Sequence, residues 1–324
     1  MSMTRELLLL RHGKSDWETG TDDFHRPLKD RGKRSAQRMG VWLLQHGLIP
    51  DYVISSPAER AIVTAEKVCK VMDMGSKGIQ QDNRVYGADP DTLLEVIAES
   101  PEGALRVMLV GHNPGLEELL DYLAAGPVPV PEDGKLLPTA TLARLGIAGD
   151  WRNLGKGMAR VISITRPAVL PSKFPYPASS GTELRDRPAY YYTQSSVIPY
   201  RLRKGRVEIL LIASSKMKHW VVPKGIKEPG LSPRDSAAKE AWEEAGVEGE
   251  VSRSILGSYT CEKWGATCTV DVYAMEVTAI VPEEQWEQLH RGRECVSPDE
   301  AAKRLKQKEL VPMVQALAKT ITGK

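Results

Sequence analysis

The sequence predicts an α/β protein of two domains, a doubly wound, mostly parallel sheet followed by a sandwich with a mixed sheet. The chain has 324 residues, whereas a single domain typically has about 150. Short apolar runs alternate with helical patterns in the first half, which is typical of parallel sheets covered by helices. In the second half, the predicted strands and helices do not alternate in this way. A proline-rich stretch separates the two halves.

Composition narrows the class of protein. Hydrophobic residues make up 41% of the chain and charged residues 27%, which excludes a disordered chain. The formal net charge of +2 gives no reason to expect a nucleic-acid or membrane partner, so local charges must hold any anionic substrate. Four cysteines without Cys-x-x-Cys spacing indicate a reduced, cytoplasmic protein. The apolar run at residues 7–10 is too short for a signal peptide or a membrane span.

The first half shows three strands, each followed by a helical pattern. Ser56, Pro57 and Glu59 form a helix-start signal that places Arg60 in the first helical turn. The predicted strands are 7–10, 52–55 and 107–110, and the helices that follow them are 34–46, 57–71 and 117–123.

Two histidines and two arginines follow these strands directly. Arg11 and His12 come after the first strand, Arg60 after the second and His112 after the third. Because ligands bind beyond the carboxyl ends of strands in an open α/β sheet, we expect these four side chains to converge. Guanidinium groups bind phosphate, and a neutral imidazole can accept a phosphoryl group covalently. An ordinary loop or capping role is the alternative for any one of them taken singly.

The motifs that contain these residues resemble the histidine phosphatase superfamily, most closely its compact phosphohistidine phosphatase (SixA-like) branch. The resemblance covers nearly all of residues 1–170 and implies a phosphoglycerate mutase-like fold. It implies that His12 is the phosphoryl acceptor and that Arg11, Arg60 and His112 bind phosphate, without metal or another cofactor. The motifs are Arg11-His12-Gly13-Lys14-Ser15-Asp16-Trp17, Arg26-Pro27-Leu28, Ser56-Pro57-Ala58-Glu59-Arg60-Ala61 and Gly111-His112-Asn113-Pro114-Gly115.

The general acid of this site stays unassigned. Larger members of the superfamily carry a Glu or Asp after a strand in the middle of the domain, and only Asp89 lies near the matching stretch. A substrate with a good leaving group, such as phosphohistidine, would not need such an acid.

Residues 169–194 are predicted to be a linker between domains 1–168 and 195–324. Proline is frequent in this stretch and favours extended, semi-rigid chain. Three consecutive tyrosines, Tyr190, Tyr191 and Tyr192, are unusual for a free linker and indicate docking on a domain face.

The second half contains a well-marked helix with a cluster of carboxylates. Ser232 is expected at its N-cap, and Gly246 at its end. The predicted helix is 233–245, and the predicted strands are 196–200, 207–213, a stretch up to 259 and 268–277, with a helical region from about 298.

Glu240, Glu243 and Glu244 share one face of this helix. Like charges at this spacing destabilise a bare helix, and a hard divalent cation such as Mg²⁺ would remove the repulsion. A solvated acidic helix face is the alternative for the cluster taken alone.

The segment from Trp220 to Val247 resembles the Nudix box, and the resemblance to Nudix (MutT-like) hydrolases spans residues 195–324. It implies an α/β/α sandwich with Mg²⁺, or alternatively Mn²⁺, held by Gly225, Glu240, Glu243 and Glu244. Glu243 and Glu244 are the expected catalytic carboxylates, which hold the metal and activate water.

Two box positions differ from the family pattern, because Leu231 replaces a Glu and Lys239 an Arg. They leave the identity of the catalytic base open. The sequence Pro223-Lys224-Gly225 resembles the family members that cleave diadenosine polyphosphates and diphosphoinositol polyphosphates. Lys224 is therefore expected to bind bridging phosphates.

The leading hypothesis is a bifunctional hydrolase of small, nucleotide-like phosphorylated molecules. One domain would cleave a pyrophosphate bond with Mg²⁺, and the other would remove a phosphoryl group through phospho-His12. The alternative is a phosphatase of a phosphohistidine protein with a regulatory, nucleotide-binding Nudix-like domain. A third hypothesis makes one domain a catalytically silent scaffold.

Overall fold

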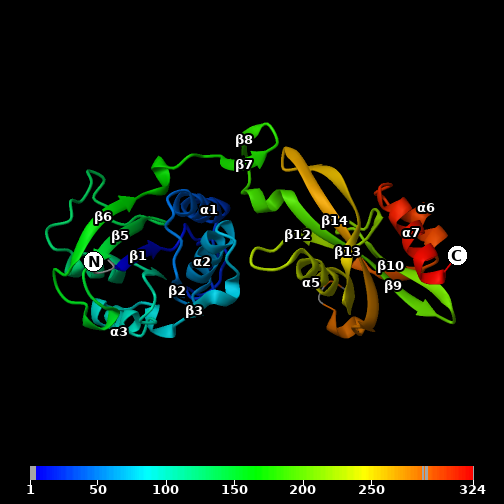
Figure 1. Cartoon of the computed structure of the whole chain (residues 1–324). Helices are drawn as coiled ribbons and strands as arrows, with labels where there is room; N and C mark the ends of the chain where they lie inside the picture. Colours follow the sequence, from blue (N-terminus) through cyan, green and yellow to red (C-terminus); the bar gives the residue numbers. More distant parts are fainter. Residues whose placement is uncertain (1–4, 287, 289–290, 324) are drawn as a thin grey trace. The chain divides into compact units, whose positions relative to one another are not determined.

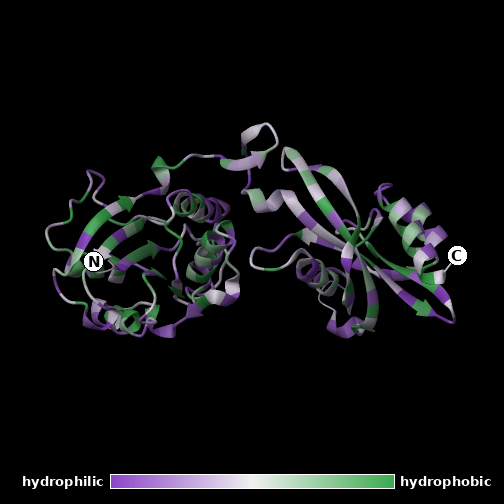
Figure 2. Ribbon diagram, in the orientation of Figure 1, coloured by the Kyte–Doolittle hydropathy of each residue, from purple (hydrophilic) through white to green (hydrophobic). Residues whose placement is uncertain are grey.

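The computed structural model describes residues 5–286, 288 and 291–323 and divides the chain into two compact units (Figure 1). Unit 1 comprises Met1–Phe174 and unit 2 Pro175–Lys324. In Figure 2, hydrophobic residues lie mainly along the central strands and on one side of the helices, whereas the loops are largely hydrophilic. None of the helices in the described ranges is long and apolar enough to cross a membrane.

Unit 1 contains a six-stranded sheet in the order β3-β2-β4-β1-β5-β6. The first four strands are parallel, whereas β5 is antiparallel to β1 and to β6. The predicted mostly parallel sheet is therefore confirmed. Its elements are β1 (Arg5–Arg11), α1 (Asp30–Gln45), β2 (Tyr52–Ser55), α2 (Glu59–Val71), β3 (Ile79–Gln81), α3 (Pro90–Ala98), β4 (Arg106–Gly111), α4 (Gly115–Leu123), β5 (Leu142–Ile147) and β6 (Ala159–Thr165).

Helices cover both faces of this sheet. Leu7 and Leu9 of β1 pack in the core on the side of α3 and α4, and Leu8 and Leu10 pack in the core on the side of α1 and α2. All four leucines are fully buried. A central strand that is buried on both faces reads as a continuous apolar run, which explains the four consecutive leucines.

The start of α2 differs from the prediction. Ala58, not Ser56, occupies the N-cap position, and the helix begins at Glu59. The Ser56 hydroxyl accepts a hydrogen bond from the Ala58 amide and also lies 2.9 Å from His112 Nε2. Ser56 therefore connects the start of α2 to His112. Arg60 still lies in the first turn of α2, as predicted.

Unit 2 is built on a seven-stranded mixed sheet, with β9 and β14 parallel and the other pairs antiparallel. Helix α5 packs on one face through its alanines, and α6 and α7 contribute to the core on the other, so the predicted sandwich is confirmed. Its elements are β9 (Thr193–Arg203), β10 (Arg206–Ala213), β11 (Trp220–Val221), β12 (Lys224–Ile226), α5 (Pro233–Ala245), β13 (Val247–Lys263), β14 (Ala266–Ile280), β15 (Arg293–Val296), α6 (Pro298–Arg304) and α7 (Leu310–Thr322).

Both ends of α5 agree with the sequence signals. The Ser232 hydroxyl accepts a hydrogen bond from the Asp235 amide, and Pro233 is the first helical residue. Gly246 ends the helix with a φ of 59°, a left-handed conformation that glycine adopts at little cost.

The stretch before β9 packs on unit 2. It contains a hairpin of β7 (Phe174–Ala178) and β8 (Gly181–Arg185). The Arg185 guanidinium lies 3.3 Å from the centre of the Tyr176 ring and 4.6 Å from that of Tyr192. Tyr192 is fully buried, and its ring stands edge-on to Trp264. The expected docking of this end of the stretch is confirmed at Tyr192.

Candidate active sites

The four predicted residues of unit 1 lie together. Arg11 ends β1 and His12 follows it, Arg60 lies in the first turn of α2, and His112 follows β4. All four line one cavity of about 520 Å³ at the carboxyl ends of the parallel strands. The cavity is also lined by Lys14, Ser15, Trp17, Asp23, Arg26, Tyr86, Gly87, Asn113 and Thr139.

The His12 imidazole is held in the form that a nucleophile needs. Its Nδ1 lies 2.7 Å from the carbonyl oxygen of Gly13, so the proton is on Nδ1 and the lone pair is on Nε2. The Gly13 amide in turn donates to the Thr64 hydroxyl at 2.9 Å. Burial lowers the pKa of His12 to about 3, and the nearby positive groups at Arg60 and Arg11 act in the same direction. His12 is therefore neutral at neutral pH.

The second histidine lies directly beside the first. The ring centres of His12 and His112 are 5.1 Å apart. Burial lowers the pKa of His112 to about 4, and Arg60 contributes to this shift. His112 Nε2 pairs with the Ser56 hydroxyl, while its buried Nδ1 has no hydrogen-bond partner among the described residues.

Asp23, Arg26 and Tyr86 belong to the cavity, although sequence reasoning did not predict them. The Asp23 carboxylate binds Arg26 at 2.9 Å and Arg60 at 2.8 Å, and it accepts a hydrogen bond from the Tyr86 hydroxyl at 2.7 Å. The Tyr86 hydrogen bond and the two arginines lower the pKa of Asp23. Arg26 stands in one of the family motifs, whereas no local signal in the sequence points to Tyr86.

Several buried donors around the cavity have no partner among the described residues. They are Nε of Arg11, Nε and Nη1 of Arg26, and Nε of Arg60. Buried polar groups are nearly always hydrogen-bonded, because leaving one unpaired costs about 1–3 kcal/mol. An anion with several acceptor oxygens would satisfy such donors, so the cavity fits a phosphoryl group.

Asp89 does not lie in the cavity. Its carboxylate accepts a hydrogen bond from the Thr92 amide at 2.9 Å and caps α3. Asp23 is therefore the one carboxyl side chain among the described residues that line the cavity.

In unit 2, Glu240 projects from α5 onto Gly225. A Cβ atom at Gly225 would lie 1.9 Å from Oε1 of Glu240, so only glycine admits the carboxylate in this position. Burial raises the pKa of Glu240 to about 7, and the negative charges of Glu244 and Glu243 add to the shift. The three predicted glutamates are thus close enough to repel one another.

Two basic residues hold the other carboxylates. Glu244 accepts a hydrogen bond from the Lys224 amide at 3.0 Å and forms an ion pair with Arg291 at 2.6 Å. Lys239, at the family's Arg position, lies 3.6 Å from Glu243 and 3.9 Å from Glu228. Neither Arg291 nor Glu228 was predicted, and no motif marks Arg291.

The side chains around Glu240 offer carboxylate oxygens to a divalent cation. Within the described ranges, no three His, Cys, Asp or Glu side chains form a preformed metal cluster. Burial first, and then the negative charges of Glu244 and Glu243, raise the pKa of Glu240, and hard cations such as Mg²⁺ prefer carboxylate oxygens as ligands. The residues therefore fit Mg²⁺ by their chemistry, although Glu244 is held by Arg291 here.

Lys224 lies next to this cluster. Its backbone amide contacts Glu244, and its amine lies 3.4 Å from the Tyr259 hydroxyl. Burial lowers the pKa of Lys224. The position is compatible with the predicted contact to bridging phosphates.

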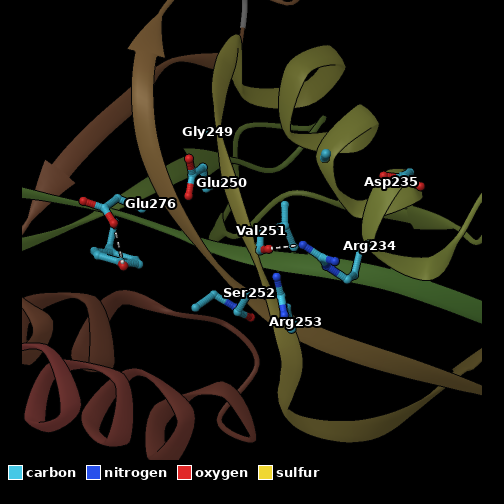
Figure 3. Close-up of a pocket in the computed structure, with 11 residues that line it drawn as sticks. Arg234, Asp235, Gly249, Glu250, Val251, Ser252, Arg253 and Glu276 are labelled. Carbon is cyan, nitrogen blue, oxygen red and sulfur yellow. Dashed lines mark hydrogen bonds between the residues drawn. The ribbon is translucent and has the colours of Figure 1, made fainter.

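Unit 2 has another cavity, of about 610 Å³, shown in Figure 3. Arg234 and Asp235 reach it from the first turn of α5, Arg253 from β13 and Glu276 from β14. Arg234 donates to the carbonyl oxygen of Val251 at 2.6 Å. The three predicted glutamates of α5 are not among the residues that line it, so this cavity is separate from the carboxylate cluster.

Comparisons with known proteins find a match to one family model in each unit. The model of the histidine phosphatase superfamily (branch 1) matches residues 7–85, and that of the Nudix domain matches residues 193–317. An uncharacterised protein of Mycobacterium tuberculosis is 30% identical over 166 residues, which cover 49% of this chain and 99% of that protein.

Two further relatives match one part of the chain each. Diphosphoinositol polyphosphate phosphohydrolase 2 of Rattus norvegicus is 38% identical over 100 residues, 30% of this chain and 53% of that protein. The crystal structure of the proposed phosphohistidine phosphatase SixA from Agrobacterium tumefaciens is 28% identical and covers 50% of this chain and 98% of its own, with a TM-score of 0.40.

Proposed function

We propose that this chain, which belongs to the histidine phosphatase superfamily through unit 1 and to the Nudix family through unit 2, carries two complementary hydrolase activities. Both families hydrolyse phosphorylated compounds. Unit 1 would remove a phosphoryl group through phospho-His12, and unit 2 would cleave a pyrophosphate bond. The observation that carries the proposal is the neutral His12 beside buried cationic donors that lack partners.

The unit 1 reaction follows from the state of His12. Nε2 holds the free lone pair, so it would attack phosphorus while Arg11, Arg60 and His112 bind the non-bridging oxygens. Water would then attack phospho-His12, release orthophosphate and restore the neutral imidazole. No proton has to leave Nε2 of His12 before the first step, because burial in the cavity keeps the imidazole neutral at neutral pH.

The unit 2 reaction would use the carboxylates of α5. Glu240, Glu243 and Glu244, together with the backbone at Gly225, would hold a divalent metal ion, which makes bound water a better nucleophile and neutralises phosphate charge. Glu243 or Glu244 would take the proton of the attacking water, and Lys224 would bind the bridging phosphates. The resemblance of this chain to a rat diphosphoinositol polyphosphate phosphohydrolase supports diphosphoinositol polyphosphates as substrates.

A second candidate function has support in unit 2. Arg291 already neutralises Glu244, and Leu231 and Lys239 replace two residues of the box. Unit 2 would then bind a nucleotide as a regulatory module, while unit 1 dephosphorylates a phosphohistidine protein.

One series of assays separates these functions. The protein is offered dinucleoside polyphosphates, nucleoside triphosphates, diphosphoinositol polyphosphates and a phosphohistidine protein, with and without Mg²⁺. His12→Ala and the pair Glu243→Gln/Glu244→Gln are tested beside it. Each change should abolish one activity and spare the other. Pyrophosphate cleavage that survives the double glutamine change would exclude the assigned metal site, and turnover of the phosphohistidine protein alone would favour the regulatory function.

A further inference from the structure

Arg26 is a third guanidinium in the unit 1 cavity, beyond the two that the proposed mechanism uses. Only 6% of its surface is exposed, and its Nη2 binds Asp23. The guanidinium carbon lies over the Trp17 ring, 3.4 Å from its centre, in a cation–π contact. Nε and Nη1 of Arg26 are buried without a hydrogen-bond partner among the described residues.

The two oxygens of Asp23 set Arg26 beside Arg60. Oδ1 binds Arg26, and Oδ2 binds Arg60. Both residues line the cavity, and buried donors of both guanidiniums have no hydrogen-bond partner among the described residues. Two adjacent cationic donor groups are therefore available, although the transferred phosphoryl group needs only one of them next to His12.

The charge of the cavity also exceeds what one phosphate needs. Its described lining carries four cationic side chains, at Arg11, Lys14, Arg26 and Arg60, and a single carboxylate at Asp23. These groups leave an excess of three positive charges, whereas a phosphomonoester carries about −1.5 to −2 at neutral pH. A volume of about 520 Å³ also leaves room for a larger ligand.

We propose that Arg26 and Lys14 form a second anion subsite, and that unit 1 removes the terminal phosphoryl group of small molecules that carry a diphosphate. The inference rests on the proposed phosphatase function of this same cavity and names its substrate class. The terminal phosphoryl group lies at His12, Arg11 and Arg60, and the adjoining one lies at Arg26 and Lys14. Trp17 is a positioning residue that keeps the Arg26 guanidinium in place.

The lack of a general acid agrees with such a substrate. Asp89 caps α3 outside the cavity, and Asp23 is engaged by two arginines and Tyr86. Nε2 of His12 forms the new N–P bond while the bridging P–O bond breaks, and the electron pair leaves with the adjoining phosphate. This leaving group has a pKa of about 6, so it departs without a proton. Water then cleaves the N–P bond, releases orthophosphate, and gives its proton to the products or to solvent.

The test compares two phosphonates that cannot be hydrolysed. Binding of methylphosphonate and of methylenediphosphonate is measured by calorimetry, with EDTA present and in the Glu243→Gln/Glu244→Gln background, so that unit 2 contributes no metal-dependent binding. The diphosphonate should bind at least about tenfold more tightly than the monophosphonate, because it forms additional charge-assisted hydrogen bonds. Arg26→Gln should reduce this preference to about twofold or less and leave methylphosphonate binding largely intact.

Two further variants keep the outcome interpretable. Arg31→Gln changes an exposed arginine of α1 outside the cavity and should preserve the preference. Trp17→Ala removes a side chain that is 70% exposed, so folding is not at stake, and it should lower the preference part of the way. The inference is overturned if methylphosphonate binds and the diphosphonate binds no better, or if Arg26→Gln weakens both ligands equally. Failure of both ligands to bind would instead contradict the phosphatase function itself.

Discussion

At the scale of single residues, the protonation state of His12 decides the chemistry of unit 1. The Gly13 carbonyl oxygen fixes the Nδ1 proton, and burial keeps the ring neutral. A protonated imidazole has no lone pair on Nε2 and cannot attack phosphorus. Sequence motifs indicated that His12 and His112 would lie together, but the tautomer depends on the loop geometry that only the structure provides.

The two histidines of the cavity should therefore remain neutral in mildly acidic solution. In an imidazole NMR titration, His12 and His112 should show no transition between pH 8 and 5, because burial lowers their pKa values to about 3 and about 4. The unfolded chain binds protons at these histidines near pH 6.5, so the free energy of unfolding should fall as the pH drops from about 6.5 towards 3. A sample unfolded in urea is the control. A transition near pH 6.5 for either residue in the folded protein would contradict the account.

At the scale of the elements, sequence patterns predicted those with strong local signals. Four buried leucines marked β1, and Ser232, Pro233 and Gly246 marked both ends of α5. The edge strands β3 and β6 and the inner strand β5 were missed, because their pairing is set by the sheet more than by local pattern. The start of α2 was placed too early because the Ser56 hydroxyl binds within the site. Tertiary contacts between residues distant in sequence bring three further side chains into the two sites, and no local sequence pattern predicts such contacts. These side chains are Asp23, Tyr86 and Arg291.

The cap of α5 can be tested by a single substitution. Ser232→Ala removes the hydroxyl that accepts the Asp235 amide, which should cost about 1 kcal/mol. Amide hydrogen exchange in α5 should then become about fivefold faster, since this energy corresponds to that factor. Ser297→Ala, which removes the matching cap of α6, should speed exchange in α6 instead. Unchanged exchange in α5 would show that packing alone holds the helix.

The contact between β12 and α5 makes a sharper prediction about the carboxylate cluster. Gly225→Ala puts a methyl group into the space of the Glu240 carboxylate, and the flexible side chain should move rather than the backbone. We expect Mg²⁺-dependent pyrophosphate cleavage to fall by at least about tenfold, because misplaced catalytic groups cost at least this much. The thermal unfolding midpoint should change little. Retention of full activity would exclude a role for Glu240 next to Gly225.

At the scale of the whole molecule, the chain joins two sites that handle phosphate by different means. Unit 1 uses fixed cationic side chains, whereas unit 2 presents carboxylates that fit a cation. The overall charge of +2 conceals this contrast, because the charges that matter are local. The sequence was sufficient to predict both fold classes, since each unit contains a specific motif set. It could not predict the Arg291–Glu244 ion pair, which joins residues 47 positions apart.

Chelation should separate the two activities. EDTA should abolish pyrophosphate cleavage by unit 2 and leave phosphoryl release by unit 1 unchanged, because only pyrophosphate cleavage requires a divalent cation. Added Mg²⁺ should restore the lost activity. Parallel loss of both activities would contradict a metal-independent mechanism in unit 1.

Rapid quenching of the reaction can detect the covalent intermediate on His12, on which the chemistry of unit 1 depends. The protein is mixed with substrate, quenched in alkali to preserve phosphohistidine, and analysed by mass spectrometry of its peptides. We expect a phosphoryl group on His12 during turnover and none in His12→Ala, which should lose phosphatase activity while keeping pyrophosphate cleavage. Phosphatase turnover by unit 1 without phosphorylation of His12, or phosphatase activity that persists in His12→Ala, would exclude a covalent role for His12.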